Sequence, residues 1–304
     1  MPTSHHFASQ DPFLRRWIRR FISMGVCTFL LITIVAAFPQ ILVLTLLIDA
    51  FRQTQFASTR TFLFITLYLL SEAYGVVGAA GLWFSHKILK CGNTEDYISR
   101  NYELQWRWAY LLVEASSRIF NLTWHIEDDP KRAAGPALIF MRHSSLGDTL
   151  MPIRVLSHPY RLRLRYVLKK ELLWDPSIDI VGQRLSNFFV DRQSKRRMSQ
   201  MKAMQSMVTD LKTNEAALIY PEGTRATPEK RNRIIDELER TGKSRQLAYA
   251  KSLKHLLPPR LGGAMTFLAS APKTDVIFCA HHGFEGAAQL SDLWHDHIIG
   301  KTIR

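Results

Sequence analysis

The longest uncharged segment of the chain constrains its fold most strongly. Residues 21–48 contain 28 consecutive positions without a charged side chain, whereas a helix that crosses a hydrocarbon layer of about 30 Å needs only about 20 residues. This segment is therefore predicted to belong in a membrane. Pro39 lies inside it, and proline interrupts helical hydrogen bonding. A bent or re-entrant helix is thus an alternative to a straight span.

A second apolar stretch, residues 61–84, follows a short connection at residues 49–60. Its later half carries small residues of the kind that let two helices approach closely, namely Gly75, Gly78, Ala79 and Gly81. We interpret the two segments as a membrane helical hairpin. A removable signal peptide is the alternative for the first segment, but its apolar run is too long and no small-residue cleavage site follows it.

Basic residues flank this hairpin. Arg15, Arg16, Arg19 and Arg20 precede it and Lys87 and Lys90 follow it, while the connection carries Arg52 and Arg60. The positive-inside rule then predicts that both ends lie in the cytoplasm. We expect a basic tail at residues 1–20, the hairpin at 21–90 and a catalytic domain at 91–304. Glu72 has two interpretations, as a functional acid within the membrane or as a side chain that faces the partner helix or an interface.

After Cys91, short apolar runs alternate with longer helical ones, a pattern typical of layered α/β domains. Strands are expected at residues 119–126, 136–141, 163–168, 187–190, 216–220 and 276–279, and helices at 149–156, 195–211, 228–254 and 262–271. The helix at 195–211 repeats apolar side chains at helical spacing: Met198, Met201, Met204, Met207, Val208 and Leu211. This stripe favours a core face over a cofactor site.

The net charge of +14 permits nucleic acid, anionic lipid or phosphorylated substrates as partners. Basic residues are densest at 154–202, where twelve of them accompany four acidic ones. Neither interleaved aromatics nor a helix-turn-helix pattern is present, so membrane phospholipids are expected as partners and nucleic acid is not. Cys27, Cys91 and Cys279 lie far apart, and neither a disulfide framework nor a zinc site is expected.

The first of two chemical motifs is His143-Ser-Ser-Leu-Gly-Asp148, which follows an expected strand. Active-site residues favour such strand ends. An imidazole can take a proton from an attacking hydroxyl, and a carboxylate on its other nitrogen fixes the tautomer. The intervening loop allows Asp148 to fold back onto His143. The alternative for Asp148 is a helix N-cap.

The second motif, Tyr220-Pro-Glu-Gly-Thr-Arg225, also follows an expected strand. Pro and Gly favour a fixed turn there, which is expected to expose Glu222, Thr224 and Arg225. The guanidinium of Arg225 matches phosphate well. The alternative is a plain surface turn before a helix that is capped at Thr227.

The two motifs together, in this order, resemble the glycerolipid acyltransferase superfamily, whose hallmarks are H-x4-D and [FY]-P-E-G-T-R. Lys170-Glu171-Leu172 and the run that ends at Arg192 resemble the intervening block. The resemblance implies an α/β fold with a mixed sheet flanked by helices. It assigns His143 and Asp148 to catalysis, and it assigns acceptor binding to Arg192, Glu222, Gly223, Thr224 and Arg225. The run Leu257-Pro-Pro-Arg260 is similar to the branch of lysocardiolipin acyltransferases and their bacterial relatives.

Two positions depart from the family pattern. Arg142 replaces the Asn that often precedes the histidine, and the proline of the last motif is absent from Val276 to Cys279, which leaves open the contribution of that strand to donor binding. His281 and His282 follow the strand. A metal role for them lacks further ligands at suitable spacing, and no metal is expected.

These features predict a membrane-bound O-acyltransferase. Its acyl group is expected to move from acyl-CoA or acyl carrier protein to the free hydroxyl of 1-acylglycerol-3-phosphate, which gives phosphatidic acid without a cofactor. The alternatives are an acyltransferase that acts on a lysophospholipid with a larger headgroup and a catalytically silent lipid-binding protein. The expected location is a bacterial inner membrane, with the catalytic domain in the cytoplasm.

Overall fold

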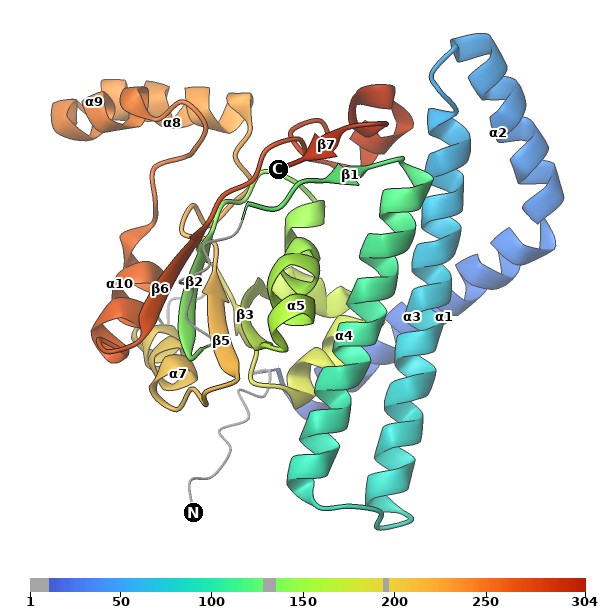
Figure 1. Cartoon of the computed structure of the whole chain (residues 1–304), viewed down its shortest axis with the longest axis horizontal. Coiled ribbons are helices and arrows are strands. Elements are labelled where there is room, and N and C mark those ends of the chain that lie inside the picture. Colours follow the sequence, from blue (N-terminus) through green and yellow to red (C-terminus); the bar gives the residue numbers. More distant parts are fainter. Residues whose placement is uncertain (1–10, 128–134, 194–196) are drawn as a thin grey trace.

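The structure is a computed structural model that describes residues 11–127, 135–193 and 197–304 (Figure 1). Residues 1–10 of the predicted basic tail lie outside the described residues. Residues 13–20 of that tail form the start of the first helix. The helices are α1 (Phe13–Ala36), α2 (Phe38–Arg52), α3 (Ala57–Lys87), α4 (Thr94–Ile119), α5 (His158–Tyr160), α6 (Pro176–Ile180), α7 (Arg197–Thr209), α8 (Pro228–Arg240), α9 (Ser244–Ser252) and α10 (Leu261–Ser270). The strands are β1 (Thr123–Trp124), β2 (Ala137–Met141), β3 (Arg163–Lys169), β4 (Phe188–Val190), β5 (Glu215–Ile219), β6 (Asp275–Cys279) and β7 (Thr302–Ile303).

The central sheet has the strand order β4-β3-β5-β2-β6, and all four of its pairings are parallel. The prediction of a mixed sheet is therefore wrong, because a mixed sheet also contains antiparallel pairs. Consecutive strands are joined by crossovers long enough to return the chain to the same edge, and such crossovers produce parallel neighbours. Because all five strands run in one direction, their carboxyl ends meet at one edge of the sheet. A separate parallel pair, β1 and β7, joins the two ends of the domain.

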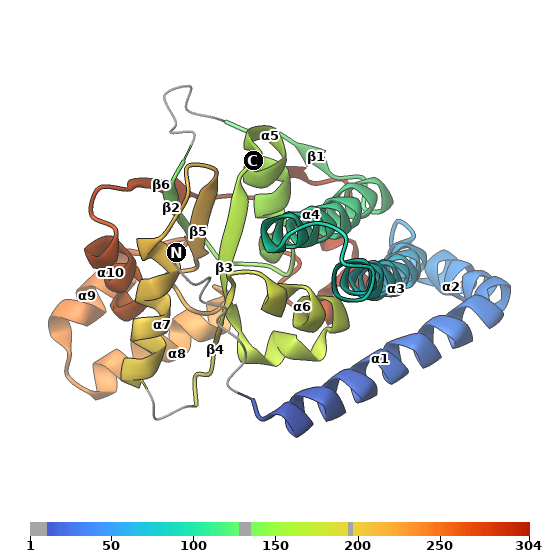
Figure 2. The ribbon, with the colours of Figure 1, turned by 90° about the horizontal axis from the view of Figure 1, so that it is seen from below.

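Both faces of the sheet are covered, which explains why its central strands read as continuous apolar runs. All five residues of β2 and all five of β5 are buried. Along β2, Leu138 and Phe140 face a core cluster with α7 and α10, while Ile139 and Met141 belong to the cluster on the side of α4. Figure 2 shows the sheet between these two helical layers.

Several expected elements differ at their ends. Only Thr123–Trp124 of residues 119–126 is strand, because α4 continues to Ile119. The expected helix at 149–156 is replaced by a 3-10 turn, Gly147–Thr149, and a π turn, Ile153–Ser157. The expected helix at 228–254 breaks into α8 and α9, where Gly242 has a φ of 65° that interrupts the helix.

The apolar stripe of α7 is only partly in the core. Met204, Met207 and Val208 are buried, and Leu211 packs against them. Met198 and Met201 are exposed instead, so the expected core face covers only the later part of the helix. The buried part of α7 packs against α10 and against residues of β2 and β5.

Among the residues that the structure describes, helices α1 and α3 are long and apolar enough to cross a membrane. The uncharged segment bends after Ala36, and Pro39 lies in the first turn of α2, where its missing N–H costs no helical hydrogen bond. The carboxylate of Asp49 then accepts hydrogen bonds from the backbone N–H groups of Ser58 and Thr59 and thereby caps α3. The bent form of the first segment is thus the one observed.

Helix α3 packs against α4 and α6 as well as against α1 and α2 (Figure 1). Glu72 is buried and accepts hydrogen bonds from Trp108 Nε1 of α4, at 3.1 Å, and from the backbone N–H of Ser177 in α6, at 3.0 Å. Its interpretation as a side chain that faces a partner helix fits these contacts. Gly75 and Gly78 likewise face α6 and α4 rather than α1. These small residues were expected at the contact between the two helices of the membrane hairpin, and they lie instead where α3 packs on the domain.

Candidate active site

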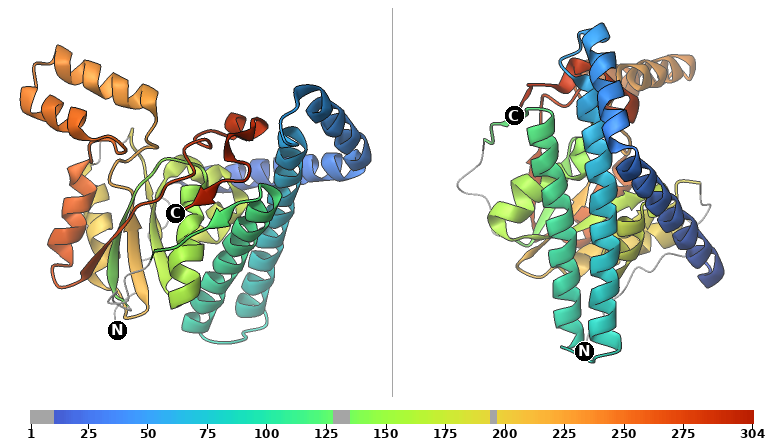
Figure 3. Two further views of the ribbon diagram at one scale, coloured as in Figure 1. Left: turned by 45° about the horizontal axis from the view of Figure 1, so that its top comes forward. Right: turned by 90° about the vertical axis from the view of Figure 1, so that its right-hand side faces the viewer.

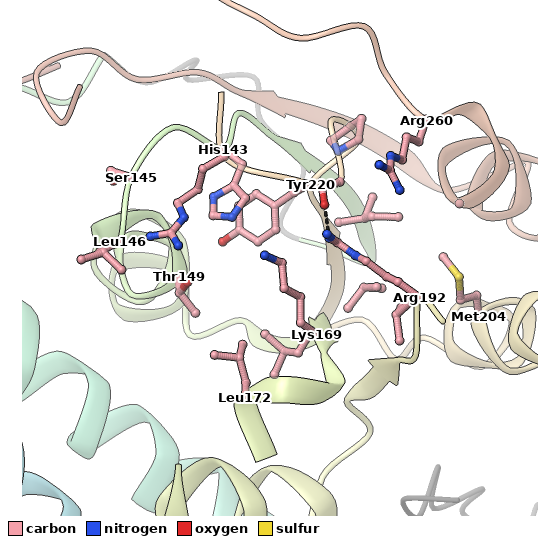
Figure 4. Close-up of a pocket in the computed structure, with 18 residues that line it drawn as sticks. His143, Ser145, Leu146, Thr149, Lys169, Leu172, Arg192, Met204, Tyr220 and Arg260 are labelled. Carbon is pink, nitrogen blue, oxygen red and sulfur yellow. Dashed lines mark hydrogen bonds between the residues drawn. The ribbon is translucent and has the colours of Figure 1, made fainter. Parts of the chain in front are cut away.

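Each strand of the parallel sheet delivers one polar side chain to the same edge. His143 follows β2, Lys169 ends β3, Arg192 follows β4, Tyr220 follows β5 and His281 follows β6. Ligands of open parallel sheets bind outside the carboxyl ends of the strands. The parallel arrangement therefore assembles one site from residues that lie far apart in the sequence, and Figure 4 shows this region.

His143 and Asp148 form the pair that their spacing predicts. His143 Nδ1 lies 3.0 Å from Asp148 Oδ2, and the imidazole packs on the ring of Tyr220 with centroids 4.6 Å apart. The hydroxyl of Tyr220 donates to the backbone oxygen of Asp148 at 2.6 Å. This arrangement leaves Nε2 as the imidazole nitrogen that can act on a substrate in the neighbouring cavity.

The loop between the pair is wrapped around the carboxylate. Asp148 is fully buried, and its Oδ2 accepts from the backbone N–H groups of Ser144 and Ser145. The Ser145 hydroxyl donates to Oδ1. These donors precede Asp148 in the chain, so Asp148 does not act as the N-cap of a following helix. It orients His143 instead.

The pKa shifts in the pair follow from burial and from charge. Burial lowers the pKa of His143, and the positive charges of Arg225 and Lys169 lower it further, against the opposing effect of Asp148. Burial acts to raise the pKa of Asp148, but hydrogen bonds from His143, His281 and Ser145 outweigh it and hold that pKa well below its usual range. The pair therefore combines an ionised carboxylate with a neutral imidazole near neutral pH.

His281 is a second partner of the same carboxylate. Its side chain is almost fully buried, and its Nε2 lies 3.1 Å from Asp148 Oδ1. Its neighbour His282 is exposed and lies 3.1 Å from Glu285 through Nδ1. The two histidines thus diverge, and among the residues described no group of three or more His, Cys, Asp or Glu side chains could hold a metal ion.

A cavity of about 290 Å³ opens beside His143. Four cationic side chains line it, namely Lys169, Arg192, Arg225 and Arg260, and no carboxylate is among its 18 described lining residues. Figure 4 shows Lys169, Arg192 and Arg260 around the space next to His143. Burial lowers the pKa of Lys169, and the charges of Arg192 and Arg225 lower it further. Such mutual repulsion favours an anion in the cavity.

The turn after β5 shapes one wall of this cavity. Gly223 has a φ of 67°, a conformation that favours glycine, and a Cβ there would crowd the Arg260 side chain. Arg192 donates to the backbone oxygen of Gly223, and Arg225 donates to that of Ala288. Both guanidinium groups are thereby held against backbone while they line the cavity.

Two residues of the same turn lie elsewhere than expected. Glu222 is buried rather than exposed, is absent from the cavity lining, and has no hydrogen-bond partner for either carboxylate oxygen among the residues described. Burial raises its pKa to about 8. Thr224 accepts from Lys230 Nζ at 2.9 Å, and Thr227 caps α8, as the alternative interpretation of this motif had it. Arg225 and Gly223 of this turn therefore line the cavity, whereas the side chain of Glu222 is buried beneath the turn.

The sequence motifs missed three residues of the site. Lys169 precedes the quoted Lys170-Glu171-Leu172 block, Arg260 was assigned only to a branch resemblance, and His281 was weighed only as a metal ligand. The usable signal is positional, because Lys169 and His281 lie at or just after the end of an expected strand.

A parallel α/β domain that holds a histidine–aspartate pair beside a cationic cavity is suited to group transfer onto an anionic substrate. Residues 123–275 match the family model described as Acyltransferase. This match covers half of the chain, which therefore belongs to the acyltransferase family. It spans β1 to the start of β6, so α1–α4 and His281 lie outside it. No solved structure matches the chain.

Proposed function

We propose that this acyltransferase moves a fatty acyl group from acyl-CoA or acyl carrier protein to the free hydroxyl of 1-acylglycerol-3-phosphate, which yields phosphatidic acid. The observation that carries this proposal is the His143–Asp148 pair at the wall of a cavity lined by four cationic side chains. The pair supplies a general base, and the cations supply a place for the phosphate of the acceptor.

In this mechanism, His143 Nε2 takes the proton of the acceptor hydroxyl as its oxygen attacks the thioester carbonyl carbon. A carbon–oxygen bond forms, the carbon–sulfur bond breaks, and the thiolate leaves and receives the proton that His143 took. Asp148 holds the imidazole in place and stabilises its protonated form. Backbone N–H groups in the turn after Asp148 are the candidates that stabilise the negative charge on the thioester oxygen.

Arg192 and Arg225 are the proposed phosphate ligands, because both line the cavity and both are fixed by backbone carbonyls. Glu222, Gly223 and Thr224 then act through the turn: Gly223 allows its shape, and Thr224 ties it to Lys230. In this view Glu222 and Thr224 position the arginines rather than contact the acceptor. A preorganised guanidinium loses little freedom on binding phosphate.

An apolar cavity of about 70 Å³ adjoins the cationic one and shares Thr149 and Leu168 with it. Apolar side chains of α4 and the π turn line it, among them Leu104, Trp108 and Ile153. This position supports a donor whose acyl chain lies on the apolar side of His143 while charged groups lie on the other. Pre-formed sites of this kind combine apolar walls with a few polar groups.

Membrane attachment is proposed through α1 and α2. Apolar side chains on them point outward, including Phe13, Leu14, Phe21, Phe29, Ile32, Val35, Val43, Leu44, Leu47 and Phe51. Exposed apolar area of this extent marks a lipid or protein interface. Lipid contact suits the reaction, because a two-chain product is almost insoluble in water and must leave into a bilayer.

Arg225→Ala provides a test of the acceptor site. The substitution removes a guanidinium and leaves the contact between His143 and Asp148 in place. KM for 1-acylglycerol-3-phosphate is therefore expected to rise by about ten-fold or more, while KM for the donor changes little. The measurement is steady-state acyl transfer with each substrate varied in turn. Equal effects on the two KM values would refute the assignment.

A larger headgroup is the second candidate for the acceptor. Four cations exceed what a single phosphate needs, and this favours a lysophospholipid that carries two phosphates, as lysocardiolipin does. Acylation of a panel of lysolipids, each with one acyl-CoA and one acyl carrier protein donor, separates the candidates. Preference for 1-acylglycerol-3-phosphate supports the main proposal. Absence of transfer with every pair would instead indicate a silent lipid-binding protein.

A further inference from the structure

A helical hairpin that projects from the domain carries an unusual distribution of charge. Helices α8 and α9 pack on each other, and α8 buries none of its residues, so the hairpin stands away from the core (Figure 3). Residues 243–260, which span α9 and the chain that follows it, contain five basic residues and no acidic one. The acidic residues of the hairpin all lie on α8, so its two helices differ in charge.

Three of these five basic residues pair with no side chain in the part of the chain that the structure describes. Lys251 pairs with Glu239 at 2.6 Å and Arg260 lines the cavity. Lys243, Arg245 and Lys254 are exposed and make no side-chain hydrogen bond or ion pair with any residue that the structure describes. Their charges are therefore available to an external anion.

Exposed apolar side chains lie among these charges. Tyr249 is half exposed, Leu256 is 41% exposed and Leu261 is 63% exposed. We define the α9 surface as the exposed side chains of Lys243, Arg245, Tyr249, Lys254, Leu256 and Leu261. Long basic side chains beside an aromatic ring and leucines are the composition of segments that lie at a lipid headgroup layer. A surface that binds only soluble anions gains nothing from the leucines.

The α9 surface lies on the same side of the molecule as α1. Figure 2 and the right-hand view of Figure 3 agree that the α8–α9 hairpin and α1 project in a common direction from the sheet. Helix α1 also exposes large apolar side chains, among them Phe13, Phe21 and Phe29. One bilayer surface can touch both.

The base of the hairpin is tied to the active-site loops. Lys230 at the start of α8 donates to Thr224 and to the backbone oxygen of Arg225. At the other end, the backbone N–H of Arg260 donates to Pro221 at 2.7 Å, and Arg142 donates to the backbone oxygen of His255. Whatever binds the α9 surface is consequently held next to the cationic cavity.

We propose that the α9 surface binds the anionic headgroup layer of the phospholipid bilayer and forms a second membrane contact beside α1 and α2. Each basic side chain close to an anionic surface contributes attraction that salt screens. The contact places the mouth of the cavity at headgroup level. An acidic carrier protein offers the same charge but no apolar layer for Leu256 and Leu261, so lipid fits the surface better.

The test places a fluorescent label on the full chain. Cys27, Cys91 and Cys279 are replaced by Ser, and Leu256→Cys is labelled with an environment-sensitive dye. Glu237→Cys on exposed α8 is the matched control. The protein is reconstituted in phosphatidylcholine bilayers with and without phosphatidylglycerol, each with brominated lipid as quencher. Quenching is expected at position 256 in the anionic bilayers, reduced by salt or by omission of phosphatidylglycerol, and not at position 237.

A charge-reversal variant tests the electrostatic part. Lys243→Glu, Arg245→Glu and Lys254→Glu together are expected to abolish quenching at position 256, since each lost positive charge lowers the ratio of docked to free surface by about five-fold. The matched control reverses three exposed basic residues elsewhere, Arg100→Glu, Arg118→Glu and Lys273→Glu, and should retain quenching. Unchanged unfolding temperatures in detergent confirm that both variants fold.

Two results would overturn the proposal. One is a label at position 256 that stays as water-exposed in anionic bilayers as the label at position 237. The other is protection of position 256 that appears only when acidic acyl carrier protein is added, which would make the α9 surface a protein-docking site. Quenching by brominated lipid measures membrane contact and does not require enzymatic turnover. Failure of this proposal can therefore be distinguished from failure of the proposed acyl transfer.

Discussion

Asp148 is the residue on which the side chains of the site converge. Its Oδ2 contacts His143 and two backbone N–H groups, and its Oδ1 contacts Ser145 and His281. A buried carboxylate is costly unless its acceptor positions are filled, and here they are. The result is a fixed negative charge that orients His143 and that stays ionised through the neutral pH range.

Removal of His281 should change the pH profile as well as the rate. His281→Ala removes an imidazole that lies 3.1 Å from Asp148 Oδ1 and helps to hold the pKa of that carboxylate down. The pKa of Asp148 then rises, and the carboxylate holds protonated His143 more tightly. The acid limb of the kcat/KM profile should move to higher pH, and kcat should fall by about ten-fold.

His281→Asn keeps a donor N–H group at a similar place and serves as the conservative control. We expect it to restore part of the rate and most of the profile. A purely structural role predicts a lower unfolding temperature for His281→Ala with an unshifted pH profile, and this pattern would argue against a positioning role.

Glu222 makes stability depend on pH. Burial raises its pKa from 4.5 to about 8 in the folded chain, so between these values the folded state binds more protons than the unfolded state. Stability contributed by the protonated group is therefore present at low pH and is lost as pH rises through about 8. In Glu222→Gln, the fall in unfolding temperature between about pH 6 and about pH 9 should be smaller by a few degrees. Identical pH dependence in both proteins would contradict a buried, protonated Glu222.

His143 and Asp148 are predicted site residues with a local partner, because they are five positions apart and one loop brings them together. Their assignment rested on the family resemblance as well as on this spacing, and Arg192 and Arg225 were assigned through the same resemblance. Lys169 and His281 reach the site only because β3 and β6 lie in the same parallel sheet as β2. Both follow an expected strand, which is a signal for an active-site position, but only the strand order places these two side chains near His143.

At the scale of elements, the short apolar strands were predictable and their direction was not. Apolar runs fix β2 and β5 within one residue, but pairing direction depends on crossovers that a single sequence leaves open. Helix α4 was not among the expected helices, although Leu104, Trp108 and Leu112 recur along it at helical spacing and are buried. A local signal existed, since Asn93 and Asp96 form a capping box at its start.

The small residues of α3 give a stability test with an internal control. A Cβ at Gly75 would contact Ser177 of α6 and lie 3.3 Å from Trp108 of α4, whereas a Cβ at Gly81 meets nothing within 4 Å. Gly75→Ala should lower the free energy of unfolding by about 1–3 kcal/mol. Gly81→Ala should leave it unchanged or raise it by up to about 1 kcal/mol, because alanine favours helix. Thermal unfolding in one detergent compares them, and equal effects would contradict the packing of α3 on α6.

At the scale of the whole molecule, α1 and α2 carry a large group of outward apolar side chains, and cations line the cavity at the carboxyl edge of the sheet. The α9 surface combines the two kinds, because Tyr249, Leu256 and Leu261 lie among its basic residues. The sequence showed the apolar segments and the excess of basic residues. Only the fold shows that α3 packs on α4 and α6 along the domain. A chain arranged in this way can keep its site at a bilayer surface while its sheet remains in water.

The measurement that tests the central claim most directly is acyl transfer by His143→Ala. The variant is purified beside the parent protein, and transfer from acyl-CoA and from acyl carrier protein to 1-acylglycerol-3-phosphate is followed under single-turnover conditions. Loss of the general base predicts a rate that is lower by about 10²–10⁴-fold, with acceptor binding retained. A rate close to that of the parent protein would contradict the role of His143 and the mechanism built on it.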